Sequence, residues 1–188
     1  MDVEAAALAR GRRRLRAVCR GDRGSGRVSV WGALAGGFAG TLVLTTIMRA
    51  ASELRLTRID LPFLLGTAFT ANRLRAKALG YALHFLAGLV FALVYYAVFV
   101  AINDSGWWLG AIFGLVHALF ASTALVNLLL PLVHPRMGSP LTGANSTALL
   151  EPPGFLMLNY GPQTPLANIL AHIAYGALVG GFTQLAGG

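Results

Sequence analysis

Charge and cysteine are both scarce in this sequence. Lys, Arg, Asp and Glu together make up 12% of its 188 residues, and only seven residues are acidic. An ordinary soluble domain carries about a quarter of its residues as charged side chains, so the composition excludes that class. The single cysteine, Cys19, can form neither an intramolecular disulfide nor a thiolate metal cluster within one chain.

Long apolar runs fill most of the chain instead. Hydrophobic residues make up 56% of the sequence, and the mean hydropathy is +0.65. A helix needs roughly 20 apolar residues to cross about 30 Å of hydrocarbon. Four runs reach that length, at residues 31–50, 80–102, 107–130 and 166–185. They predict an all-α integral membrane protein, with a four-helix transmembrane bundle in a membrane domain of residues 28–188.

A basic segment, residues 1–27, precedes the first run. It carries eight arginines against three acidic residues. Arginines before a first span favour the cytoplasmic side and are attracted to anionic lipid headgroups, by about 1 kcal/mol each. We therefore expect lipid contact and cytoplasmic termini, although five basic residues between the first two spans nearly balance the orientation signal. No aromatic or recognition element accompanies the arginines, so we expect no nucleic-acid partner.

Glycines recur at four-residue spacing in every span. Residues four apart share one face of a helix, and glycine on that face lets two helix backbones approach closely. The pattern predicts a compact bundle, and some of these stripes could instead contact other membrane protein subunits. The glycines are Gly32, Gly36, Gly40, Gly80, Gly88, Gly106, Gly110, Gly114, Gly176 and Gly180.

The first long loop contains a short helix signal. Asp60 can cap a helix that begins near Pro62, and the apolar stretch 63–69 that follows is too short to cross a membrane. We therefore expect an interfacial or re-entrant helix in this loop.

The second long loop, residues 131–165, is rich in proline and poor in charge. It holds seven of the eight prolines, and its only charged residues are Arg136 and Glu151. A disordered linker is normally charged and poor in large apolar residues, so this loop is expected to form an ordered Pro-rich cap over the bundle mouth. Arg136 and Glu151 could pair within the cap, which could also act as a ligand-binding lid.

Three of the four histidines, His84, His117 and His172, lie inside the predicted spans. An imidazole in hydrocarbon is costly unless it faces the bundle interior or a partner. At a rise of 1.5 Å per residue, His84 and His172 lie at similar depth, and His134 follows the third span in the same half. His84 and His172 are therefore candidate haem or metal ligands, each followed four residues later by a glycine that makes room for a ring.

Two other interpretations of the histidines stay open. His117 could take part in a proton relay with polar neighbours such as Thr41, Thr45 and Asn127. Alternatively, each imidazole is a neutral, buried side chain that bonds to a neighbouring helix. For a metal site, Asp60 and Glu151 are the loop carboxylates that could complete a ligand set.

The sequence contains no recognisable catalytic arrangement. No Ser-His-Asp set, phosphate-binding glycine loop or His-Glu-x-x-His motif is present, so we expect a protein that is not an enzyme. The first hypothesis is a subunit or accessory factor of a larger membrane assembly. The alternative is a haem- or metal-binding electron-transfer protein, or a small transporter of protons or a solute, that uses the intramembrane histidines.

Several short patterns together resemble a family of small four-span bacterial membrane proteins for which no function is known. The resemblance covers roughly residues 31–185 and implies a four-helix fold in the bacterial inner membrane, without implying an activity. The patterns are Gly36-x-x-x-Gly40-Thr41, Asp60-Leu61-Pro62, His84-x-x-x-Gly88, His117 after Gly110-x-x-x-Gly114, and His134-Pro135-Arg136-Met137.

Overall fold

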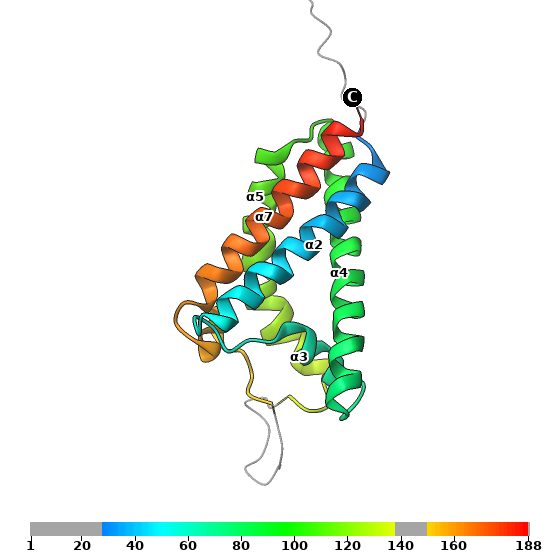
Figure 1. Ribbon diagram of the computed structural model, residues 1–188. Helices are drawn as coiled ribbons and strands as arrows, with labels where there is room; N and C mark the ends of the chain where they lie inside the picture. The colour runs from blue at the N-terminus through cyan, green and yellow to red at the C-terminus, as the bar shows by residue number, and fades with distance from the viewer. Residues whose placement is uncertain (1–27, 138–149, 188) are drawn as a thin grey trace, which may run out of the picture.

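The computed structural model describes residues 28–137 and 150–187, and the basic segment with Cys19 lies outside them (Figure 1). Four helical stretches are long and apolar enough to cross a membrane, as predicted. The third consists of three consecutive segments, and the first and last described residues lie at the same end of the bundle. The spans are α2 (Val30–Glu53), α4 (Arg73–Ile102), α5–η1–α6 (Trp107–Phe120, Ala121–Leu129, Leu130–Val133) and α7 (Thr164–Leu185).

Local capping explains why α4 begins seven residues before the predicted residue 80. The side chain of Asn72 accepts hydrogen bonds from the backbone N–H groups of Leu74 and Arg75, both at 3.1 Å. Such a cap satisfies two donors that the first turn of a helix leaves free. The basic residues after Asn72 therefore form the first turns of α4. The helix ends at Asn103, which adopts a left-handed conformation with φ of 52°.

Helix α7 packs against both α2 and α5, and α4 packs against α2 (Figure 1). The α5–α7 contact is a backbone-to-backbone seam of glycines: a Cβ on Gly176 would overlap the carbonyl oxygen of Gly110. On the other side of α7, a Cβ on Gly40 would lie 2.8 Å from the Tyr175 ring. These glycines are therefore used for contacts inside this bundle, and contacts of the stripes with another subunit stay a prediction.

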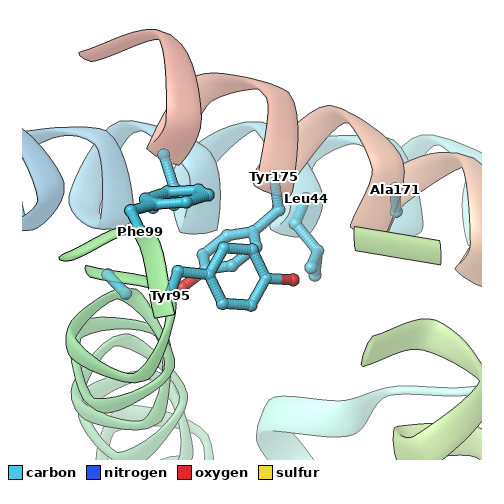
Figure 2. Packing of buried hydrophobic residues seen from close by; sticks show 7 residues of the cluster. Leu44, Tyr95, Phe99, Ala171 and Tyr175 are labelled. Atoms are coloured by element: carbon cyan, nitrogen blue, oxygen red, sulfur yellow. The ribbon is translucent and has the colours of Figure 1, made fainter. Parts of the chain in front are cut away.

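An aromatic cluster fills the bundle between α4, α5 and α7. Tyr95 and Tyr175 meet edge to face, with ring centroids 5.8 Å apart, and Figure 2 shows both rings beside Phe99. Phe99 stacks on Phe113 of α5 at 5.5 Å. Leu44 of α2 belongs to the same buried cluster, so all four spans contribute to one core.

A π-helix, η1, interrupts the third span over nine residues. Pro131 follows it and has no N–H to donate, while the side-chain amide of Asn127 donates to the backbone carbonyl of Ser122 at 2.7 Å. The Ser122 hydroxyl donates to the Ala118 carbonyl at 2.7 Å. These side-chain bonds satisfy carbonyl groups of the wider turn, a feature that is frequent at functional sites and that was not predicted from the sequence.

A short helix, α3 (Leu61–Thr67), occupies the first long loop, as the Asp60 signal predicts. It packs closely on the start of α4, where a Cβ on Gly80 would overlap the Pro62 carbonyl. Its position relative to a membrane surface stays a prediction. The Asp60 carboxylate accepts a hydrogen bond from the Phe63 N–H at 3.0 Å.

Replacing Asp60 with alanine is expected to lower the free energy of unfolding by about 1 kcal/mol, because the first turn of α3 loses its cap. Equilibrium unfolding in mixed micelles measures this change. Asn caps helices as well as Asp does, so Asp60→Asn is the matched control and should lose much less. Equal losses in the two variants would mean that the carboxylate charge, which lies 3.9 Å from Lys77, matters more than the cap.

The described parts of the second long loop are attached to the first loop. Within it, η2 (Phe155–Tyr160) buries Met157, which is 2% exposed, against Ile59 and Val126. The Arg58 N–H donates to the Tyr160 carbonyl at 2.8 Å. Residues 138–149 lie outside the described chain, so the Pro-rich cap as a whole stays a prediction.

Candidate functional site: a histidine-lined cavity

A cavity of about 410 Å³ lies between the four spans, above α3, and we call it the histidine cavity. Its volume falls within the usual range for small-molecule sites. Its wall is mostly apolar, and the residues that line it within 28–137 and 150–187 include no carboxylate, thiol, ammonium or guanidinium group. Its polar lining residues are His84, His117, His172, Thr41, Asn168 and Tyr175.

His117 and His172 form a close pair on one side of the cavity. Their ring centroids lie 4.8 Å apart with an interplanar angle of 79°, so the edge of one ring meets the face of the other. Phe91 packs against His117 at 3.9 Å. The Tyr95 hydroxyl lies 3.4 Å from Nδ1 of His117, at the limit of a hydrogen bond. The pair is thus held by aromatic contacts from α4 as well as by its own helices.

The hydrogen bond of His172 fixes which of its nitrogens carries a proton. Nδ1 lies 2.9 Å from the backbone carbonyl of Asn168, which can only accept, so Nδ1 is the donor. In the neutral ring, Nε2 then holds a lone pair, and it has no hydrogen-bond partner among the described residues. A buried ring with one committed and one open nitrogen is suited to accept a hydrogen bond from a ligand or to coordinate an ion.

His84 stands apart from this pair. Neither of its ring nitrogens has a hydrogen-bond partner in the described part of the chain, and its ring makes no aromatic contact there. It is half-buried and lines both the histidine cavity and a smaller cavity beside it. The interpretation of each histidine as a bonded structural residue therefore suits His84 least.

His134 lies outside the histidine cavity and has a structural position. It is 3% exposed, and its Nε2 lies 3.0 Å from the Leu64 carbonyl and 3.3 Å from the Thr67 hydroxyl. Its Nδ1 accepts the Arg136 N–H at 3.2 Å, and the Arg136 side chain donates to the Thr67 carbonyl. His134 and Arg136 together join the end of the third span to α3.

The two loop carboxylates also lie outside the cavity. Asp60 caps α3. Glu151 lies 3.7 Å from Arg58 and does not pair with Arg136, the partner that the sequence suggested. Beside Glu151, the Tyr160 hydroxyl donates to the Glu151 carbonyl at 2.6 Å. Burial is the main cause that raises the pKa of Tyr160, with a further contribution from the Glu151 carboxylate, so the phenol stays a donor at neutral pH.

The described residues offer neither a three-ligand metal site nor space for haem between His117 and His172. No group of three His, Cys, Asp or Glu side chains gathers around one point in residues 28–137 and 150–187. His117 and His172 contact each other directly, which leaves no space for a macrocycle between them. Haem ligation by His84 and His172 stays a prediction. Of the proposed relay residues, Thr41 lines the cavity, whereas the amide of Asn127 is committed to the Ser122 carbonyl.

Four further residues of the site were not predicted from the sequence: Tyr95, Tyr175, Phe91 and Asn168. Helical spacing offered a signal, because Asn168, His172 and Tyr175 follow at four and three residues and share one face of α7. The same spacing also fits ordinary core packing, so it could not single out a site.

No family model, curated protein or solved structure matches this chain. The function is therefore inferred from the geometry of the histidine cavity.

Proposed function

We propose that this protein binds a small, largely apolar molecule from the lipid bilayer in the histidine cavity. The proposal rests on a cavity of about 410 Å³ that has a mostly apolar wall and three imidazoles, each with at least one ring nitrogen that has no hydrogen-bond partner among the described residues. An apolar wall selects a lipid-soluble body by burial, and a few hydrogen-bonding groups orient it. The bound molecule would carry an oxygen or nitrogen atom that bonds to His172 or His84.

Access from the side supports a ligand that comes from lipid. Leu132 and Val133 of α6 line the cavity and are 81% and 76% exposed at the bundle surface. Both residues are apolar, so the rim suits hydrocarbon rather than water. A ligand would enter between α6 and α4, where the cavity wall reaches the outer face.

We also propose that binding serves a larger membrane assembly, with the protein as an accessory subunit that holds or delivers the ligand. A bacterial inner-membrane location with cytoplasmic termini is part of the same proposal. It is supported by the family resemblance and by the arginines of residues 1–27.

Filling the cavity tests the binding proposal. Ala87 lines it, and Ala87→Phe should remove a bound molecule that co-purifies with the wild-type protein in lipid nanodiscs. Mass spectrometry of an organic extract, per mole of protein, measures occupancy, which is expected to fall at least tenfold. Ala97→Phe makes the same change on an exposed position of the same helix and should leave occupancy unchanged.

The same preparation separates the alternatives. A Soret band in its optical spectrum that disappears in His84→Ala would identify haem and replace the proposed ligand class. Equal occupancy in Ala87→Phe and Ala97→Phe, or a wild-type extract with only bulk lipid, would overturn the proposal.

A further inference from the structure

A second, smaller cavity of about 40 Å³ adjoins the histidine cavity, and we call it the polar inlet. Five residues line both spaces, so the two are neighbours that share one wall. His84 is the one imidazole among the shared residues. The shared residues are Leu44, Leu61, His84, Met157 and Asn168.

The polar inlet differs from the histidine cavity in chemistry. Its lining adds three apolar residues, Met48, Ile59 and Pro62, and five residues with polar side chains, Thr45, Arg49, Ser52, Asp60 and Tyr81. Polar and charged groups therefore join the lining of the inlet, while much of its surface is still apolar. A molecule that spanned both spaces would need an apolar body and a polar head.

The donors in the inlet favour an anionic head. One Arg49 nitrogen pairs with Glu53 at 2.6 Å, which leaves the other guanidinium N–H groups for a ligand. The hydroxyls of Ser52 and Tyr81 have no hydrogen-bond partner among the described residues. The one carboxylate of the lining, Asp60, is already occupied by the Phe63 N–H and by Lys77.

The size of the inlet limits the head. A single water needs roughly 10–15 Å³ of such space, so about 40 Å³ holds a few waters or one group as small as a carboxylate. Guanidinium groups also bind carboxylates with strong, charge-assisted hydrogen bonds.

We infer that the ligand is an amphiphile with a carboxylate head, held in the polar inlet by Arg49, Ser52 and Tyr81. Its chain passes His84 and fills the histidine cavity. This inference rests on the proposed function and deepens it by naming the ligand class. His84 lines both spaces, so a carboxylate oxygen of the head is the atom that bonds to it, as the proposed function requires.

Matched probes test the head separately from the chain. Binding of radiolabelled decanoate and decanol is measured on protein in phosphatidylcholine nanodiscs, with empty nanodiscs subtracted. Decanoate is expected to bind about tenfold more tightly than decanol, because a charge-assisted hydrogen bond contributes enough free energy for a difference of that size. Arg49→Gln should lower decanoate affinity about tenfold and leave decanol affinity within about twofold. Arg73→Gln, on a basic residue that does not line the inlet, should change neither.

Each result has a distinct meaning. Equal affinities for decanoate and decanol, both lost in Ala87→Phe, would overturn the carboxylate head and leave the proposed function intact. Tighter binding of decyltrimethylammonium than of decanoate would also overturn it, and would point to Asp60. Failure of both decanoate and decanol to bind would overturn the amphiphile, while the extracted molecule would still decide the proposed function.

Discussion

Replacing Gly180 with alanine is expected to destabilise the bundle by about 1–3 kcal/mol, the usual cost of overpacking a close contact. A Cβ at this position would overlap the Gly106 carbonyl and lie 3.1 Å from the Gly110 Cα. Both obstacles are backbone atoms, which cannot turn aside as the end of a long side chain can. The α5–α7 seam would have to widen, and the wall that carries His117 and His172 would move with it.

The neighbouring glycine provides the matched control for this prediction. A Cβ on Gly181 would lie 3.7 Å from the Trp107 Cβ, an ordinary contact. Gly181→Ala should therefore be neutral, or stabilising by up to about 1 kcal/mol because alanine favours helix. Unfolding by increasing sodium dodecyl sulfate in mixed micelles, followed by circular dichroism, gives both values. Equal stability of the two variants would mean that the seam is looser than described.

Removing the His134 ring is expected to cost about 2–3 kcal/mol. The ring is almost fully buried and contacts Leu64, Thr67 and Arg136 through hydrogen bonds. A typical bond contributes about 0.5–1.5 kcal/mol, and a buried group left without a partner costs about 1–3 kcal/mol. His134→Ala would also free the end of the third span from α3, which forms the floor of the histidine cavity.

A conservative variant separates the bonds from the packing. In His134→Gln, the side-chain amide keeps a donor that can reach the Leu64 carbonyl, so the loss should be about half of that in His134→Ala. Unfolding free energy and binding of radiolabelled decanol are measured on the same samples. A stable His134→Ala variant with unchanged decanol affinity would contradict the role of this tether.

The spans were predictable because hydropathy is a local property of the sequence. Each apolar run forms its own backbone hydrogen bonds in a helix, whatever its neighbours do. The caps at Asp60 and Asn72 are also local features of the sequence. Only the Asp60 cap is predicted, so the predicted second span starts at residue 80 and not at Arg73, where α4 begins. Interior positions for the histidines followed from the cost of exposing an imidazole to hydrocarbon.

The pairing of His117 with His172 was not predictable from depth alone. Which side chains meet depends on how each helix is rotated about its axis, and the glycine seam between α5 and α7 sets that rotation. The π-turns of η1 then redirect the residues after Ala121, so that Leu125 and Val126 face the cavity. The residue spacing of a regular α-helix does not account for this change in direction, because a π-helix has more residues per turn.

The central place of α7 has a consequence for how the protein is made. Residues of α7 supply the partner faces for α2 and α5, and yet this helix follows the other three spans in the chain. The first three spans are therefore made before the helix that packs on α2 and α5. Until α7 joins them, the glycines of α2 and α5 that face it are unmatched, and the histidine cavity lacks the wall that carries Asn168, His172 and Tyr175.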